Sequence, residues 1–352
     1  MNKRIFKDET STIGEIPFYK IGTFGGKADA FITRKKYEEY KKKYPYPQKG
    51  NLLISASGSI GRIIEYNGEE AYCQDSNIVW LDHDNTILDV FLKPTYEIIK
   101  WDGIEGTTIK RLYNKNILNT VIYKPTIDEQ RKIGKLFIIL NNTIQLHERK
   151  YEELTLIKKA LLQKLFPKKD GFKPEVRYKN FNDAWEQRKL GEVIISEHKG
   201  KVKSIMKGGN TNYLETNYLN GGTAQKVDAI ADVSKDDVLI LWDGSKAGTI
   251  YHGFEGALGS TLKAYVPKYS GDFLYQILKK NQDKIYQSYR TPNIPHVIKN
   301  FTEKFNVSIP TIIEQQEIGD FFKQLDSLIT LHRRKLEKLK QLKKFLLQNM
   351  FI

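Results

Sequence analysis

The sequence predicts an α+β protein in which two mixed α/β domains are joined by two long helices that form an antiparallel coiled coil with pseudo-twofold symmetry. Three observations predict this fold. One long segment occurs twice, each copy carries apolar residues at alternating steps of four and three, and the remaining residues form short β-branched and aromatic runs. The expected order is a first domain (1–124), a first helix (125–166), a linker (167–184), a second domain (185–309) and a second helix (310–352).

The first domain shows short strands separated by turns. The runs NLLIS (51–55) and SNIVWL (76–81) are rich in β-branched and apolar residues and are bounded by Gly, Asn or Asp. A helix is expected around residues 34–43. Together these runs are typical of a small mixed α/β domain.

The two helical segments are copies of each other. Residues 125–166 begin PTIDEQ and residues 310–351 begin PTIIEQ, and they align without a gap at an offset of 185 residues. Roughly half of the aligned positions are identical, which identifies an internal duplication. Each copy begins with Pro and carries an acidic residue, Glu129 or Glu314, near the positive end of the helix dipole.

Each copy has the seam of a coiled coil. One row of seam positions consists of Ile133, Leu140, His147, Leu154 and Leu161 in the first copy, and of Ile318, Leu325, His332, Leu339 and Leu346 in the second. An apolar stripe of this length must be buried, and the other copy is the expected partner because the two seams match. Each helix follows its own domain and the linker leads the chain back, which favours antiparallel pairing.

The seam also contains polar residues. His147 and His332 are interpreted as polar positions that fix the register of the pair, and a metal or pH-sensing role remains the alternative. Lys158 and Lys343 fall in the second seam row, and we expect their ammonium groups to extend to the edge of the seam.

The second domain resembles the first more weakly than the helices resemble each other. The turn GSIG (58–61) has a parallel in GSKAG (244–248), and each turn follows a run of buried-strand type. A further helix is expected around residues 272–289. The sequences of the two helices have therefore been constrained, while those of the two domains have diverged.

The charge indicates a polyanionic partner. The chain has 57 Lys and Arg against 42 Asp and Glu, a net charge of +15, so DNA or RNA is the first expectation and an anionic membrane surface the second. Basic residues beside Ser, Thr, Asn and Tyr are suited to phosphates and base edges. The candidate contacts in the first domain are Lys20, Thr23, Lys27, Ser57, Ser59, Arg62, Thr107, Thr108, Lys110 and Arg111. Those in the second domain are Asn212, Tyr213, Lys226, Ser245, Lys246, Lys263, Arg290 and Asn293.

The sequence lacks the motifs of the obvious enzyme classes. It contains no Pro-Pro or Pro-Cys dipeptide of a DNA methyltransferase, no Gly-x-Gly-x-x-Gly and no phosphate-binding loop. Its single cysteine, Cys73, forms neither an internal disulfide nor a zinc site. Two Glu-x-Lys strings, at 148–150 and 197–199, are attributed to chance. We expect no catalytic residue, cofactor or metal in this chain.

Targeting signals are also missing from the sequence. No apolar run follows the first residues, and no stretch of eighteen apolar residues occurs, so neither a signal peptide nor a membrane span is expected. The cytoplasm is the default location.

The duplicated Pro-Thr-Ile-x-Glu-Gln helix and the segment WEQRKLGEV (185–193) resemble the specificity subunits of type I restriction-modification systems. The resemblance covers nearly the whole chain. It implies two target recognition domains that each read one half of a bipartite double-stranded DNA site, with the helices as a ruler between them. It also implies two modification subunits that bind S-adenosylmethionine, and restriction subunits that use ATP and Mg²⁺, while this chain is non-catalytic.

One departure from the family pattern concerns the first domain. A segment like residues 185–193 normally precedes the first domain as well, and its counterpart would fall before residue 1, so we expect the first domain to lack this lead-in. Two alternatives remain open: a self-contained nuclease or methyltransferase, and a coiled-coil scaffold that binds only protein.

Overall fold

The computed structural model describes residues 5–58, 60–73, 77–103, 111–168 and 171–351. The chain forms two compact units, one made of Met1–His147 with Lys335–Ile352 and the other of Glu148–Arg334. Each unit contains one mixed α/β domain and one end of the helix pair. Among the described residues, no helix is both long enough and apolar enough to cross a lipid bilayer.

Among the residues that the structure describes, the first unit contains two small antiparallel sheets. One pairs β1 (Ile16–Phe18) with β2 (Ala30–Ile32), and the other has β3 (Leu52–Ser55) between β4 (Ile63–Glu65) and β5 (Ile78–Trp80). The helical elements are η1 (Lys7–Glu9), α1 (Arg34–Lys43), α2 (Asp89–Ile98) and α3 (Asn114–Asn119). Helix α1 starts where the Thr33 side chain accepts a hydrogen bond from the Lys36 amide, as an N-cap does.

The described part of the second unit contains three sheets. A four-stranded antiparallel sheet has the order β11 (Ile250–His252), β10 (Val238–Leu241), β13 (Leu262–Pro267), β7 (Ile194–Lys199). A three-stranded sheet has the order β12 (Ala257–Leu258), β8 (Lys207–Leu214), β9 (Lys226–Val227), and β14 (Asn306–Ile309) pairs with β6 (Glu186–Lys189). The helical elements are η2 (Leu190–Glu192), α5 (Thr216–Leu219), α6 (Gly271–Lys280), α7 (Gln282–Ser288) and α8 (Phe301–Lys304).

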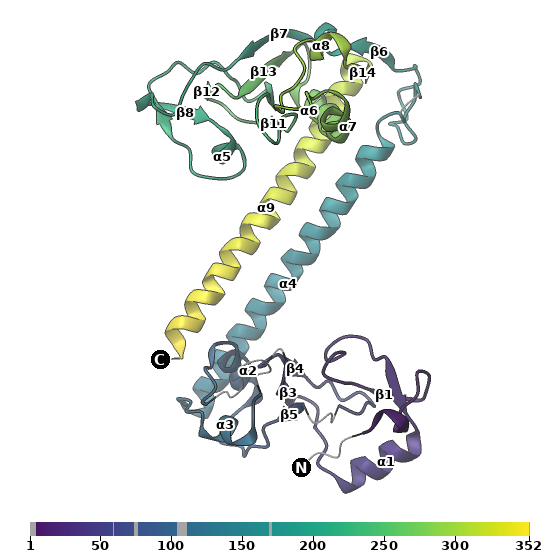
Figure 1. Ribbon diagram of the computed structural model, residues 1–352, viewed down its shortest axis with the longest axis vertical. Coiled ribbons are helices and arrows are strands. Elements are labelled where there is room, and N and C mark those ends of the chain that lie inside the picture. Colours follow the sequence, from purple (N-terminus) through teal and green to yellow (C-terminus); the bar gives the residue numbers. More distant parts are fainter. Residues whose placement is uncertain (1–4, 59, 74–76, 104–110, 169–170, 352) are drawn as a thin grey trace. The chain divides into compact units, whose positions relative to one another are not determined.

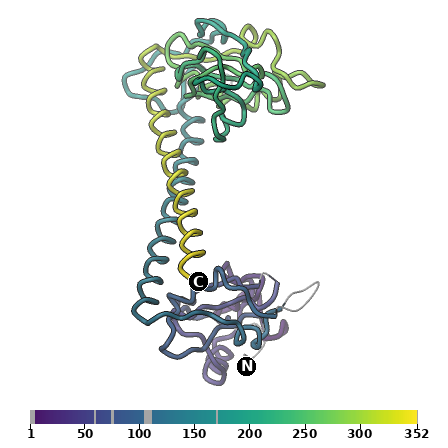
Figure 2. The backbone as a smooth tube through the Cα atoms, turned by 90° about the vertical axis from the view of Figure 1, so that its left-hand side faces the viewer, coloured from purple at the N-terminus to yellow at the C-terminus, as the bar shows by residue number. Residues whose placement is uncertain are grey.

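The two long helices are α4 (Ile127–Lys164) and α9 (Ile312–Met350), and they lie side by side (Figures 1 and 2). In the first unit, Ile133 and Phe137 of α4 share a core with Leu347 of α9. In the second unit, Leu161 of α4 packs with Ile318 of α9. The start of one helix therefore packs against the end of the other, and the predicted α+β fold with paired helices is confirmed.

The duplication is visible in matching hydrogen bonds. The buried amides of Gln130 and Gln315 occupy equivalent positions, and each Nε2 donates to the carbonyl of the preceding Pro, Pro125 or Pro310, at 2.9 Å. The sequence Pro-Thr-Ile-x-Glu-Gln thus encodes one structure twice: the Gln side chain turns back onto the Pro and fixes how the chain enters the helix.

The seam residues vary in burial. Ile133, Leu140, Ile318 and Leu325 are buried, whereas His147, Leu154, Leu161, His332, Leu339 and Leu346 are half-buried. The buried members lie toward the first turns of each helix, where the adjoining domain adds a second wall. Burial of the stripe therefore depends on the domains as well as on the facing helix.

The seam lysines differ from the expectation. The Lys158 ammonium does not extend into solvent but binds Asp326 at 2.6 Å, with only 16% of its side chain exposed. The position equivalent to Asp326 in the first unit is Asn141, which cannot form an ion pair, and Lys343 pairs instead with Glu97 of α2 at 2.7 Å. An acidic partner within reach holds each ammonium group in place.

Candidate DNA interface

Both domains build the same frame from a central strand, a turn and a returning segment. In the first domain, the turn after β3 leads into β4, and the Leu112 amide donates to the Ala56 carbonyl at 2.8 Å. In the second domain, the turn after β10 leads into β11, and the Val297 amide donates to the Trp242 carbonyl at 3.0 Å. Each frame presents a turn beside a second exposed segment.

In the first domain, this frame brings together three predicted contact residues. Ser57 and Arg111 form an isolated antiparallel bridge, and Arg62 lies at the far end of the same turn, where its amide donates to Ser55 Oγ at 3.0 Å. The side chains of Arg62 and Arg111 are exposed. The predicted contacts Ser59, Thr107, Thr108 and Lys110 lie outside the described residues.

The loop between β1 and β2 adds three more candidates to this surface. A Cβ placed on Gly25 would lie 3.3 Å from an Arg62 Nη atom, so the loop packs directly against Arg62. Thr23 closes a turn with Lys20, and Lys27 is exposed. The Lys20 ammonium pairs with Asp29 at 2.8 Å, but because its side chain is 43% exposed it remains accessible to a phosphate.

In the second domain, four candidates gather around the matching turn. Ser245 and Lys246 are exposed in the turn, and Asn293 is exposed in the returning segment. Arg290 connects the two, because its Nη1 donates to the Ser245 carbonyl at 3.1 Å and its guanidinium lies 4.9 Å from the centre of the Tyr286 ring. Arg290 is therefore partly used to hold the turn in shape.

The remaining candidates lie elsewhere and are less suited to DNA. Asn212 and Lys226 lie in the three-stranded sheet, where Lys226 Nζ donates to Asn212 Oδ1 at 2.8 Å. Tyr213 is 7% exposed and its hydroxyl donates to a backbone carbonyl, so it belongs to the core. Lys263 pairs with Glu197 at 2.6 Å, and 13% of its side chain is exposed. We leave Tyr213 and Lys263 out of the interface because both are enclosed by their own domain.

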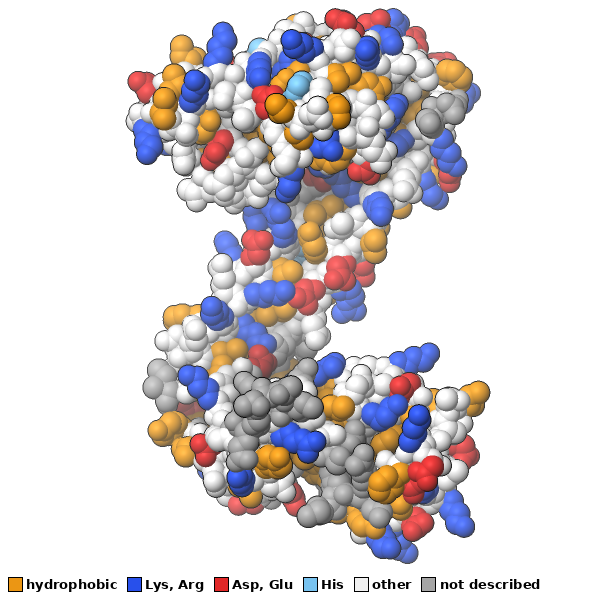
Figure 3. All heavy atoms as spheres, in the orientation of Figure 1, with side chains coloured by type: hydrophobic (Ala, Val, Ile, Leu, Met, Phe, Trp, Pro, Cys, Tyr) orange, Lys and Arg blue, Asp and Glu red, His pale blue; other side chains and the backbone are white. Residues whose placement is uncertain are grey.

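Basic groups on the surface are mixed with acidic ones. On the face seen in Figure 3, Lys and Arg side chains are interspersed with Asp and Glu over both domains. Near the second turn, Lys199 pairs with Asp243 at 2.7 Å, which leaves the exposed Lys246 as the more available charge there. On this face, the basic side chains are therefore spread over the domains rather than gathered in one patch.

A pocket that the sequence analysis did not predict lies beside the turn after β3. The pocket has a volume of about 400 Å³ and is lined by Ile60, Gly61, Ile63, Lys93, Tyr96, Glu97, Ile99 and Trp101. The rings of Tyr96 and Trp101 lie 5.5 Å apart, and Trp101 approaches the backbone of Gly61. Burial raises the pKa of Tyr96, so its hydroxyl stays protonated. A lone Trp after a helix gave no sequence signal for this contact.

One group in the second unit has the donor atoms of a cation site. Ligand atoms of Asp236, His252 and Asp272 lie within 4.8 Å of one another. The Asp272 carboxylate already has partners within the protein, however. His252 Nε2 lies 3.2 Å from it, and Lys323 of α9 binds it at 2.8 Å. We interpret this group as a link between the domain and α9.

The chain is similar to a protein family and to a solved structure. The profile of the family described as "Type I restriction modification DNA specificity domain" matches residues 1–156 and 182–341. A crystal structure of a type I restriction-modification S subunit from M. genitalium superposes with a TM-score of 0.68 at 18% identity, covering 100% of this chain and 92% of that one. That likeness is one of fold.

Curated relatives match over parts of their length. A putative type I restriction enzyme specificity subunit of Haemophilus influenzae is 51% identical over 41% of this chain and 38% of its own length. The MjaVIII specificity subunit of Methanocaldococcus jannaschii is 31% identical over 53% of this chain and 46% of its own length. The matches thus span less than half of either relative.

Proposed function

Because the chain belongs to the family of type I restriction-modification DNA specificity domains, whose specificity subunits are non-catalytic, we propose that each of its two domains reads one half of a bipartite DNA target. The observation that carries the proposal is the repeated frame. Both domains present a turn beside a returning segment, but the exposed side chains on the two frames differ. One scaffold with two different surfaces suits two different half-sites.

In the first domain, Arg62, Arg111 and the loop from Lys20 to Lys27 form the proposed surface. In the second domain, Ser245, Lys246, Arg290 and Asn293 form it. The basic groups hold phosphates, while Ser, Thr and Asn offer donors and acceptors to base edges. The pocket at Trp101 lies at the edge of the first surface and offers an apolar wall to a base.

We further propose that the paired helices set the spacing between half-sites and bind two modification subunits. The helices repeat one sequence, so they offer two equivalent docking faces, and exposed apolar residues recur at matching positions, as in Leu146 with Leu331 and Ile157 with Leu342. S-adenosylmethionine is then bound by the modification subunits, and ATP and Mg²⁺ by restriction subunits.

Domain exchange tests the reading of half-sites. The chain is co-expressed with its modification subunits, and methylated sites are mapped by sequencing genomic DNA with and without the gene. Replacing residues 185–309 by those of another specificity subunit should change one half of the target and leave the other half intact. A change in both halves, or in neither, contradicts the proposal.

Deletion tests the spacing role. Removing one heptad from each helix shortens the pair by about 10 Å, or about three base pairs of duplex. The spacer between half-sites should shorten accordingly in the same methylation map. If the shortened chain still methylates with the original spacer, the helices do not act as a ruler.

DNA binding itself separates this function from that of a scaffold that binds only protein. The assembled complex should bind its target with an affinity that falls steeply as salt rises, because phosphate contacts release counterions. Binding that is absent, or indifferent to salt, would favour the scaffold.

A further inference from the structure

In the second unit, the loop formed by residues 291–296 lies beside the turn that follows β10. The Gly244 amide of the turn donates to the Pro295 carbonyl of the loop at 2.9 Å. Asp243 and His296 also form an isolated antiparallel bridge between the turn and the loop. The loop is therefore fixed to the surface that we propose for DNA.

Hydrogen bonds close this loop upon itself. The Thr291 amide donates to the His296 carbonyl at 3.0 Å, and the His296 amide donates to Thr291 Oγ1 at 3.3 Å. The Thr291 hydroxyl donates to the Ile294 carbonyl, and His296 Nδ1 lies 3.0 Å from the same oxygen. Pro292 and Pro295 fix two of the backbone φ angles. The loop is therefore held in one conformation by its own residues.

The loop exposes an isoleucine. Ile294 is 77% exposed, and the preceding Asn293 is exposed as well. An isolated exposed isoleucine is ordinary on a protein surface. Ile294 differs because its carbonyl is held by two side chains of the loop, so that the apolar side chain is presented from a fixed backbone beside the turn that carries Lys246.

The first domain has an isoleucine at the equivalent place in its sequence. Arg111 and His296 form the same antiparallel bridge to their turns, and they lie 185 residues apart, as the two helices do. At this offset, Ile109 corresponds to Ile294, although Ile109 itself lies outside the described residues. The two residues before the isoleucine are Thr-Thr in one domain and Pro-Asn in the other. The apolar residue therefore recurs while its polar neighbours differ.

A duplex offers an isoleucine two kinds of apolar partner. One is the methyl group of thymine in the major groove, and the other is the face of a base at a step between stacked base pairs. A thymine methyl is present only where the sequence supplies it, so it does not suit two domains that read different half-sites. Every base step has apolar faces, and insertion at a step therefore suits a residue that both domains share.

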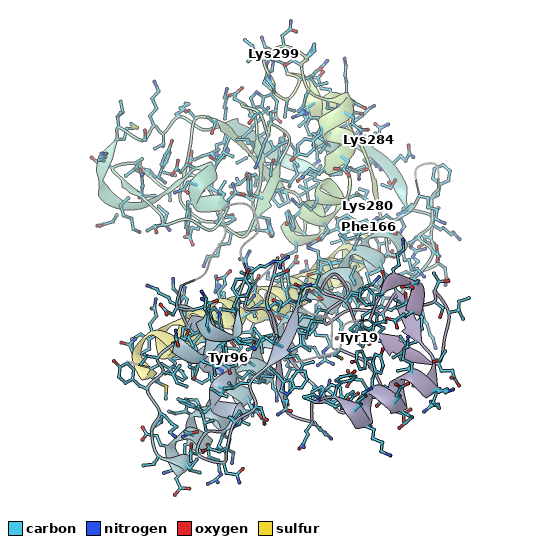
Figure 4. The ribbon with its side chains drawn as sticks, turned by 60° about the horizontal axis from the view of Figure 1, so that its bottom comes forward. Tyr19, Tyr96, Phe166, Lys280, Lys284 and Lys299 are labelled. Atoms are coloured by element: carbon cyan, nitrogen blue, oxygen red, sulfur yellow. The ribbon has the colours of Figure 1, made fainter. Side chains whose placement is uncertain are left out.

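Exposed lysines accompany the isoleucine. Lys246 lies in the adjoining turn and Lys299 follows the loop, and neither forms an ion pair with any residue that the structure describes. Figure 4 shows Lys299 at the outer edge of the second unit. Proteins that insert apolar side chains into DNA combine them with basic groups that hold the backbone. These two ammonium groups are available for phosphates, which leaves the isoleucine for the bases.

We propose that Ile294 inserts between two stacked base pairs of the half-site that the second domain reads, and unstacks them. This inference rests on the function proposed above and adds a contact that does not read the identity of a base. The energy needed to open a step depends on its sequence, and pyrimidine–purine steps open most easily. The loop therefore favours a flexible step in that half-site.

The test uses the chain assembled with its modification subunits and a duplex that carries the mapped methylation target. 2-Aminopurine, which fluoresces more strongly when unstacked, replaces in turn each adenine of this half-site on either strand. The methylated adenine is left unlabelled because a methyltransferase extrudes it by itself. Fluorescence should rise at one step when the complex binds. Ile294→Ala should abolish this rise and weaken binding about tenfold, since the apolar contact is lost.

Two control variants accompany Ile294→Ala. Ile294→Leu keeps an apolar side chain and should retain both the fluorescence rise and the affinity. Ile230→Ala removes another isoleucine of the same unit, 90% exposed, and should leave both unaltered. Wild-type fluorescence and affinity in Ile294→Ala would refute the insertion while salt-dependent DNA binding, and with it the proposed function, stands. A complex that does not bind DNA refutes both.

Two other contacts of Ile294 are separated by the same materials. Deoxyuridine in place of the thymines of this half-site removes their methyl groups and should leave the affinity unchanged. A loss of affinity on deoxyuridine that is absent in Ile294→Ala would identify a thymine contact and overturn the insertion. Dissociation of a modification subunit from the Ile294→Ala complex, with unaltered DNA affinity of the intact complex, would identify a protein contact and overturn it as well.

Discussion

Removing Arg177 should destabilise the second unit strongly. Arg177→Ala deletes two charge-assisted hydrogen bonds of 2.7 Å and leaves the Glu314 carboxylate buried, at 0% exposure, without its cation. Breaking a buried pair in this way costs about 3–5 kcal/mol, since the remaining charge is left uncompensated. Replacing both partners by methionine should cost much less, because an apolar pair of similar volume carries no desolvation penalty.

The assay is urea unfolding followed by tryptophan fluorescence, in a background where Trp80 and Trp101 of the first unit are replaced by Phe. Trp185 and Trp242 then report on the second unit alone, which matters because a chain with two units need not unfold in one step. Arg188→Ala, which removes an arginine of the same unit whose pair with Glu186 is exposed, is the matched control and should change stability by no more than about 0.5 kcal/mol. A loss below about 1 kcal/mol for Arg177→Ala would refute the buried-pair argument.

Three further predictions concern single residues. Lys246→Ala should lower DNA affinity and reduce the slope of log affinity against log salt concentration by about one. Lys263→Ala should lower stability and leave that slope unchanged, because Lys263 is enclosed with Glu197. Equal slopes for the two variants would contradict the assignment of Lys246 to the interface. Burial alone would raise the pKa of Asp272, but hydrogen bonds from His252 and Lys323 outweigh it and hold that pKa below its ordinary value. As pH falls, the Asp272 carboxylate is therefore protonated in the unfolded chain before it is protonated in the folded one, so the stability that it contributes above about pH 4 is lost in acid. Asp272→Asn should make the free energy of unfolding less dependent on pH in this acid range. Burial, with a smaller effect from Glu69, raises the pKa of Cys73 to about 12, so a thiol reagent at pH 8 should label the native chain far more slowly than the unfolded one.

The sequence predicted the features that depend on local pattern. The paired helices followed from a seven-residue repeat, and their matching ends from Pro-Thr-Ile-x-Glu-Gln, where Gln130 and Gln315 make the same bond. Both the repeat and the motif are encoded within one segment of chain, so no knowledge of distant neighbours was needed.

The features it missed depend on residues far apart in sequence. Lys158 meets Asp326 only once the register of two helices is known, and Tyr213 is buried because β8 lies between two other strands. In the sequence, nothing distinguished Lys263 from an exposed lysine; the pairing of β13 with β7 brings it to Glu197. Composition identified basic loops, but tertiary pairing decides which of their charges remain available.

The first unit is discontinuous: it consists of residues 1–147 and of residues 335–352, which follow the whole of the second unit in the chain. During synthesis, the second unit is complete once residue 334 has emerged, while Phe91 and Phe137 wait for Phe351, which is made after the whole of that unit. The domain translated first is therefore the last to finish folding. Termination or proteolytic cleavage between residues 334 and 351 would therefore damage the unit that residues 1–147 begin.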